Sequence, residues 1–385
     1  NNPKTLEYFD GLQSSDAADY SRYLFFYVNY LVHEKRFDLV KEISLEIDEL
    51  SSNLIILQTK SWIDKSNFNE IKQIFSCKNE NDILAEFFYL VSNLYSSQDE
   101  YEESNFYLNI SYFLNKKFKI NLSLMADNYY LNENYDQSLK VLQLFNSKDD
   151  LYYWFKIKQE AKIITEKENK DEALKYIEKN FKEINNPSTK TLFDLATIYK
   201  NSKKYEKAIE LYTTIMSVVE KDSLNYADLL YRRGGSFERL GEYEKSDKDL
   251  LEALKIIPNN SYVLNYLAYS WLERGQNINK AILMLEKAYK ENENDPYIID
   301  SVGWGYFLVG KYNDAEKYMR RAIELMPNDP IVNDHYGDIL WRLNRKIQAK
   351  YFWNSVLKMD DAEKEMIEKI KVKLINGLSK NNESL

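Results

Sequence analysis

The chain contains one cysteine and two histidines among its 385 residues. The single cysteine, Cys77, excludes an internal disulfide. Its apolar neighbours Ile74 and Phe75 predict a buried thiol that packs as a small hydrophobe. Because His33 and His335 lie far apart in the sequence, no Cys/His cluster has the spacing of a metal site. We therefore expect no metal.

Catalytic and phosphate-binding motifs are also missing. Neither G-x-S-x-G nor a P-loop occurs, and the pair Gly303 and Gly305 lacks the third glycine of a dinucleotide-binding turn. The carboxylates are numerous, but they follow the spacing of helix surfaces. We therefore predict that the protein is not an enzyme and uses no cofactor. A hydrolase or transferase site inside the fold is an alternative without a supporting motif, since it needs a convergent acid/base pair.

The chain has fewer basic than acidic residues, and its net charge is −9. Because phosphate binding needs a basic surface, this balance argues against a nucleic-acid partner. The longest apolar stretch, residues 23–32, is too short to span a bilayer, and no transmembrane segment is expected. The first residue is Asn1, and no signal peptide or lipidated cysteine precedes the helical pattern. The sequence leaves open whether a leader was removed.

A repeat with a pitch of about 34 residues fills the second half of the chain. Copies begin at Ala227, Ser261, Pro296 and Pro330. The eighth place holds a small residue in each copy: Gly234, Ala268, Gly303 and Gly337. Near the fifteenth place stand Gly241, Gly275, Gly310 and Asn344. Near the twentieth stand Ser246, Ala281, Ala315 and Ala349.

This spacing is typical of two antiparallel helices that pack closely. Small residues at the eighth and twentieth places let two backbones approach, and a glycine after the first helix suits a left-handed turn. The pattern continues upstream in weaker form from copies beginning at Thr189, Trp154, Lys119 and Ala85, and two further hairpins are expected from Ser52 and Ser21. Most glycines lie after residue 233, so we expect less regular hairpins in the first half.

The pattern closely resembles the tetratricopeptide repeat family. The resemblance implies an all-α fold: a right-handed superhelical solenoid of about ten antiparallel helix hairpins with a C-terminal capping helix. We predict a flexible segment over 1–20, divergent hairpins over 21–222, regular repeats over 223–363, and a capping helix with a disordered tail over 364–385. A scaffold of this kind predicts a protein or peptide partner.

By the resemblance, the second, fifth, ninth, twelfth and thirteenth places of each repeat line a concave groove. The predicted partner-binding residues are Tyr262, Asn265, Tyr269, Tyr297, Asp300, Trp304, Phe307, Asp334, Asp338, Trp341 and Arg342. Aromatic anchors beside a few polar groups are typical of peptide-binding grooves. The alternative is that Asp300, Asp334 and Trp304 bind neighbouring repeats and shape the array. His335, next to Asp334, is interpreted as a packing residue.

Members of this family that hold a C-terminal carboxylate use Lys, Arg and Asn in the groove. Here the fifth places hold Asn265, Asp300 and Asp334, and acidic groups would repel a carboxylate. We therefore expect an apolar or basic peptide.

Phrases between residues 265 and 378, such as Asp300-Ser-Val-Gly-Trp304, resemble bacterial, envelope-associated tetratricopeptide proteins. Some of these relatives are outer-membrane lipoproteins that serve periplasmic processing proteases as adaptors. The resemblance implies a periplasmic or outer-membrane adaptor for a protease or an assembly complex, with a cytoplasmic location as the alternative. A second hypothesis is a structural or self-associating subunit, in which the aromatic N-terminal hairpins form a homo-oligomer.

Overall fold

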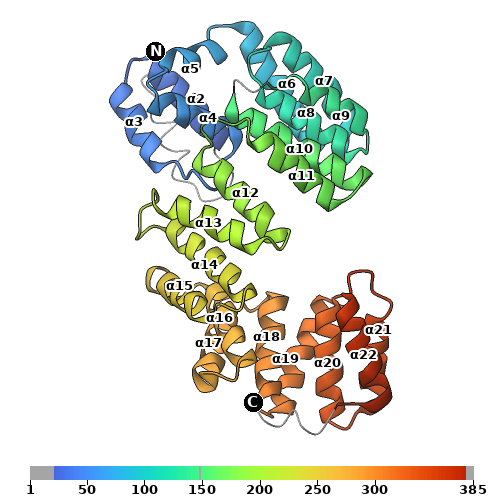
Figure 1. The fold of residues 1–385 in the computed structure, drawn as a ribbon. Helices are drawn as coiled ribbons and strands as arrows, with labels where there is room; N and C mark the ends of the chain where they lie inside the picture. The colour runs from blue at the N-terminus through green and yellow to red at the C-terminus, as the bar shows by residue number, and fades with distance from the viewer. Residues whose placement is uncertain (1–20, 147–148, 379–385) are drawn as a thin grey trace. The chain divides into compact units, whose positions relative to one another are not determined.

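The computed structural model describes residues 21–146 and 149–378 (Figure 1). Within these residues there are 21 α-helices and no strand, which confirms the all-α repeat fold. None of the described helices is long and apolar enough to cross a membrane. The predicted flexible segment 1–20 and disordered tail lie outside the described residues.

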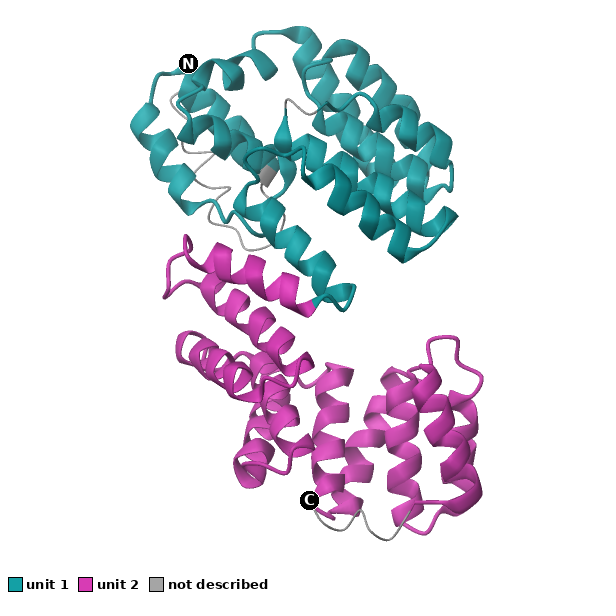
Figure 2. Ribbon diagram, in the orientation of Figure 1, with its two compact units in different colours: residues 1–204 teal, residues 205–385 magenta. Residues whose placement is uncertain are grey.

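The chain divides into two compact units, residues 1–204 and residues 205–385 (Figure 2). Unit 1 contains α2 (Ser21–His33), α3 (Phe37–Glu46), α4 (Leu54–Asp64), α5 (Phe68–Ile74), α6 (Glu80–Ser96), α7 (Tyr101–Leu114), α8 (Ile120–Leu131), α9 (Tyr135–Leu142), α10 (Asp150–Lys167), α11 (Lys170–Phe181) and α12 (Thr189–Asn201). Unit 2 contains α13 (Tyr205–Met216), α14 (Leu224–Arg239), α15 (Tyr243–Ile256), α16 (Ser261–Glu273), α17 (Ile278–Glu291), α18 (Pro296–Leu308), α19 (Tyr312–Leu325), α20 (Pro330–Arg342), α21 (Lys346–Val356) and α22 (Lys364–Asn376). The predicted change of regularity at residue 222 stays a prediction.

Residues with a left-handed backbone conformation form the turns within most helix pairs of both units. In unit 2 the turns use Gly241, Gly275, Gly310 and Asn344, as the repeat pattern predicts. In unit 1 the same conformation falls on Lys35, Ser66, Asp99 and Glu133. A non-glycine residue pays roughly 1–2 kcal/mol for this conformation. The N-terminal pairs therefore keep the turn geometry without the glycine that marks it in the sequence.

Close packing in unit 2 rests on the small residues of the repeat. A Cβ added at Gly303 of α18 would lie 3.3 Å from the carbonyl oxygen of Ala315 on α19, a residue that is fully buried. Any larger residue at this place would push the two helices apart. The capping helix α22 covers the last pair with Ile370, which is fully buried in the same apolar core.

Unit 1 folds back on itself. The α4 helix packs against α10 as well as against its neighbours α2, α3 and α5. Gln58 of α4 donates a hydrogen bond to Asp149 at 2.7 Å, and Lys190 of α12 donates to the carbonyl of Leu50 at 2.7 Å. These bonds join residues that are 91 and 140 positions apart in the chain. They tie the first two helix pairs to the end of unit 1.

The prediction of a buried Cys77 was wrong, because the side chain is exposed. It lies in the loop between α5 and α6. Phe75, which made this stretch look like core, is buried, but the chain leaves the core directly after it.

Candidate functional site

Three large side chains stand at the same place on successive first helices of unit 2. Tyr262 of α16, Tyr297 of α18 and Ile331 of α20 are the second residue of each helix, and they are 51, 64 and 48 % exposed. Since α16 packs against α18 and α18 against α20, the three side chains belong to one face. We call these three residues the ladder.

The helix caps fix where the ladder stands. Asn260, Asp295 and Asp329 precede the three helices, and each side chain accepts a hydrogen bond from the backbone N–H of its ladder residue at 2.9–3.1 Å. An Asn or Asp cap satisfies an N–H that the helix itself leaves unpaired. The repeat therefore sets both the start of each helix and the direction of its second side chain.

Behind the ladder, the predicted groove residue Asp300 forms a buried pair with His335, and the predicted groove residue Trp304 packs on this pair. Asp300 is 7 % exposed, and its two carboxylate oxygens lie 3.0 and 3.2 Å from Nδ1 of His335. The Trp304 indole stacks on the His335 ring with centroids 3.9 Å apart, and its Nε1 donates to exposed Glu273 at 2.7 Å. Burial lowers the pKa of His335, but Asp300 and the nearby carboxylates outweigh it, so the pKa is raised.

The last pair holds a second buried charge cluster. Asp338 is 5 % exposed and accepts hydrogen bonds from Trp353 at 3.0 Å and from Lys373 of α22 at 2.8 Å. The same ammonium lies 2.6 Å from Asp334. Burial raises the pKa of Asp338 to about 6, although Lys373 opposes the shift. Lys373 is the site residue that the sequence analysis missed, because the capping helix was interpreted only through its apolar side.

These contacts change the roles expected from the sequence. Asp300, Asp338 and Phe307 are buried and bond or pack inside unit 2, as the alternative in which Asp300 binds a neighbouring repeat expects. Their contact with a partner stays a prediction. Trp341 is half-buried against the end of α22, where a Cβ at Gly377 would overlap its ring. For the partly exposed and exposed residues of the set, partner contact stays a prediction.

One polar atom near the ladder is unsatisfied. The Asn265 Oδ1 is buried and accepts no hydrogen bond from the described residues. Most buried polar groups in proteins are paired. Two further residues of the predicted set, Tyr269 and Arg342, are half-buried. Burial raises the pKa of Tyr269, and the nearby carboxylates of Glu273 and Asp300 raise it further.

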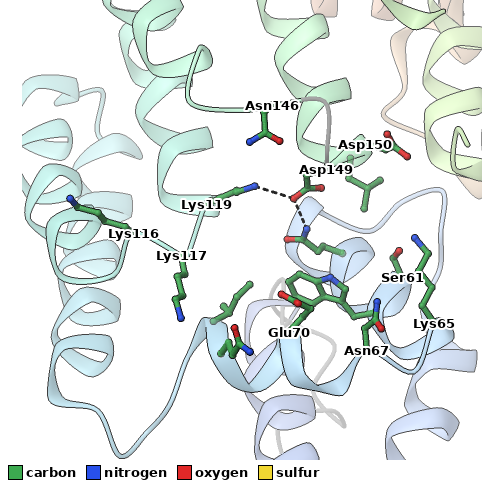
Figure 3. Close-up of a pocket in the computed structure, with 15 residues that line it drawn as sticks. Ser61, Lys65, Asn67, Glu70, Lys116, Lys117, Lys119, Asn146, Asp149 and Asp150 are labelled. Atoms are coloured by element: carbon green, nitrogen blue, oxygen red, sulfur yellow. Dashed lines mark hydrogen bonds and ion pairs between the residues drawn. The ribbon is translucent and has the colours of Figure 1, made fainter. Parts of the chain in front are cut away.

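Unit 1 contains a polar cavity of about 670 Å³ (Figure 3). One wall comes from α4 and α5, and the other from the loops before α8 and α10. Figure 3 shows Lys119 directed toward Asp149, and the two groups form an ion pair at 3.4 Å. The other charged lining residues are Lys65, Lys116, Lys117, Glu70 and Asp150. Since both signs are present without a common focus, the cavity selects neither an anion nor a cation. No group of metal-ligating side chains exists among the described residues.

Parts of this chain are similar to known proteins. A protein of Pseudomonas aeruginosa described as a TPR repeat-containing protein is 32 % identical over 143 residues, which are 37 % of this chain and 23 % of that relative. A thermophilic TPR protein of Thermus thermophilus aligns with a TM-score of 0.43 and 15 % identity over 49 % of this chain and all of that one. A MamA double mutant aligns with a TM-score of 0.38 and 18 % identity over 46 % of this chain and 97 % of that one.

A tetratricopeptide repeat family model matches residues 160–360, which is more than half of the chain. Arrays of this kind present extended surfaces to protein partners and generally serve as non-catalytic scaffolds. The protein belongs to the tetratricopeptide repeat family.

Proposed function

We propose that unit 2 is a non-catalytic adaptor that holds an extended segment of a partner protein along the ladder. The observation that carries this proposal is the exposure of Tyr262, Tyr297 and Ile331 at one place on three adjacent helices. Large apolar side chains at half exposure offer contact area that the fold itself leaves unused. Three such anchors in a row favour a long ligand over a compact one.

The spacing of the ladder sets the periodicity of the ligand. Packed helices lie about 8–10 Å apart. An extended chain in the polyproline II conformation advances by about 3.1 Å per residue with three residues per turn, so side chains three residues apart point to the same side and match adjacent anchors. The partner segment should therefore place apolar side chains at every third position.

The internal bonds of the carboxylates favour an apolar segment. Asp300 is bonded to His335, and Asp334 and Asp338 share Lys373. Since these acids already have partners inside unit 2, they offer little attraction to a basic peptide. The apolar one of the two peptide classes expected from the sequence is therefore the better match.

A selection from a random library of 12-residue peptides, read out by fluorescence anisotropy on the full chain, tests the proposal. The selected peptides should carry apolar residues at every third position and bind Tyr262→Ala/Tyr297→Ala at least about tenfold more weakly. A matched control is Leu283→Ala/Tyr351→Ala, which removes two exposed apolar side chains from α17 and α21. Peptides that bind the ladder variant and the wild type equally would contradict the ladder.

An envelope role for this adaptor rests on the resemblance of residues 265–378 to envelope-associated relatives. We propose that the partner segment belongs to a periplasmic protease or an assembly complex. Fractionation of the native cells with an antibody against the chain tests the location. Detection in the cytoplasm alone would exclude the envelope role and leave the ladder proposal intact.

A further inference from the structure

The stack of helix pairs in unit 1 is interrupted before α6. In a regular repeat array, each pair packs against the pair that precedes it. Here α6 packs against α7 and α8, whereas α4 and α5 pack against α2, α3 and α10 (Figure 1). Among the described residues, no preceding pair therefore packs closely on α6. From the preceding helices, α2 reaches α6 through Arg22, which pairs with Glu86, but the face of α6 that carries Phe87 and Leu94 stays exposed.

That side of α6 is apolar and open. Ile83, Leu84, Phe87, Leu90 and Leu94 are between 47 and 59 % exposed, and we call them the α6 stripe. Their spacing of three and four residues places them along one face of the helix. A contiguous row of large exposed apolar side chains is uncommon on a monomer unless something binds it.

A groove of about 810 Å³ runs beside the stripe. Ile83 and Leu90 line it together with the apolar side chains of Phe26, Ile55 and Phe75. At its polar end Arg22 forms a salt bridge with Glu86, and its guanidinium lies 3.5 Å from the centroid of the Tyr89 ring. Because Arg22 is already bonded, the groove offers apolar depth for a side chain rather than a free charge.

The charge around the stripe has one sign. Residues 79–115, which include all of α6 and α7, contain no Lys, Arg or His. The exposed acidic residues of this stretch are Glu80, Asp99, Glu100, Glu102 and Glu103. Two copies of this hairpin would bring like charges together, and this disfavours a second copy on the stripe. The same negative charge attracts a basic partner.

We propose that the α6 stripe is the docking site of an amphipathic α-helix with basic flanks from a partner protein. Such a helix would lie with its apolar side on the stripe and its Lys or Arg side chains near the acidic residues at the two ends of α6. Helices recognise grooves in this way through anchors at i, i+3, i+4 and i+7. This inference is independent of the proposed function, because the ladder lies in unit 2.

A designed probe tests the docking site on the full chain. The probe is a fluorescein-labelled 18-residue helical peptide with Leu at i, i+3, i+4 and i+7 and Lys on the remaining face. An otherwise identical peptide carries Glu in place of Lys. Anisotropy titrations compare the wild type, Phe87→Ala/Leu94→Ala, Glu102→Gln/Glu103→Gln, and the control Val218→Ala/Leu283→Ala, which removes exposed apolar side chains from unit 2.

The basic probe should bind the wild type and the control equally and the stripe variant about tenfold or more weakly. The Gln variant should bind it more weakly as well, with a smaller loss at 0.5 M salt because exposed charges are screened. The Glu peptide should not bind. The Gln variant keeps the stripe and the fold, so the charge prediction is tested even if the apolar substitutions disturb folding.

Other occupants would give different results, and each would overturn the proposal. Failure of the basic probe to bind, or equal binding of the Glu peptide, excludes a basic helix. Displacement of the probe by a synthetic peptide of residues 1–20 would assign the stripe to the chain's own N-terminal segment. A dimer in sedimentation velocity that is lost in Phe87→Ala/Leu94→Ala would assign it to a second copy.

Discussion

The Lys373 ammonium lies 2.8 Å from both carboxylate oxygens of Asp338, a side chain of α20 that is almost fully buried. Asp338 also accepts a hydrogen bond from Trp353 of α21. The capping helix α22 thus supplies a counter-charge to the last helix pair as well as an apolar cover. An ion pair at this depth is specific to one position of the helix, because any shift of α22 would leave Asp338 buried without its counter-charge.

Replacement of Lys373 should destabilise unit 2 strongly. Lys373→Met keeps the apolar stem and removes the charge, so it leaves Asp338 uncompensated, and removal of one partner from a buried pair costs about 3–5 kcal/mol. Urea denaturation followed by tryptophan fluorescence measures the loss. Lys371→Met is the matched control, because Lys371 pairs only with the exposed Glu368 on the same helix. Similar losses in both variants would contradict the role of Lys373.

The stability of unit 2 should fall as the pH rises above about 6.5. The folded pKa of His335 lies above its unfolded value, so its contribution is fully present below about pH 6.5 and is lost as the pH rises through the folded pKa. The pKa of Asp338 is also raised in the folded state, so its contribution to stability is likewise lost as the pH rises, between the ordinary carboxyl pKa and about 6. Of these two groups, His335 is the one whose stabilisation is lost above about pH 6.5.

Urea midpoints at pH 6.5, 7.5 and 8.5 measure this loss. The wild type should lose up to about 1.4 kcal/mol per pH unit more than His335→Gln, since one proton is involved. Parallel pH profiles of the two proteins would show that the pair with Asp300 is not linked to folding.

Gly377→Ala should be more harmful than Gly310→Ala. Both glycines have a positive φ, 76° at Gly310 and 70° at Gly377, and Gly377 combines it with a ψ of −167°, a region that essentially only glycine adopts, so a substitution at Gly377 also strains the backbone more. A Cβ at Gly310 meets open space, whereas one at Gly377 would overlap the Trp341 ring. We expect a further loss of about 2 kcal/mol for Gly377→Ala from the forced displacement of Trp341. Thermal unfolding gives the difference, and equal melting temperatures would exclude the steric contact.

The repeat pattern predicted unit 2 well because its glycines and alanines mark close backbone contacts directly. Gly303 faces the carbonyl of Ala315, and Gly310 occupies a left-handed turn. Unit 1 uses Asp99 and Glu133 in equivalent turns. These residues are strained there, and no sequence rule expects them. The N-terminal pairs were therefore recognised by helical rhythm alone.

Partner contact at the site residues stays a prediction, whereas their places on the helices can be compared with the structure. The places of the repeat correctly brought Tyr262, Tyr297 and Asp300 to first helices of neighbouring pairs, but position alone does not distinguish a side chain that faces solvent from one that bonds to the next helix. For Asp300, the contact with His335 shows that the side chain bonds to the next first helix, α20. The interruption before α6 could not be predicted, because it follows from long-range bonds such as Gln58 to Asp149.

Site-specific photo-crosslinking in the native cells tests the central claim, that the ladder holds a partner segment. A photoreactive phenylalanine analogue replaces Tyr262, Tyr297 or Ile331 in turn, and replaces the exposed Leu283 or Tyr351 of second helices as controls. The account predicts that one and the same partner is crosslinked from all three ladder positions and from neither control. Equal crosslinking from the control positions, or none from the ladder, would contradict it.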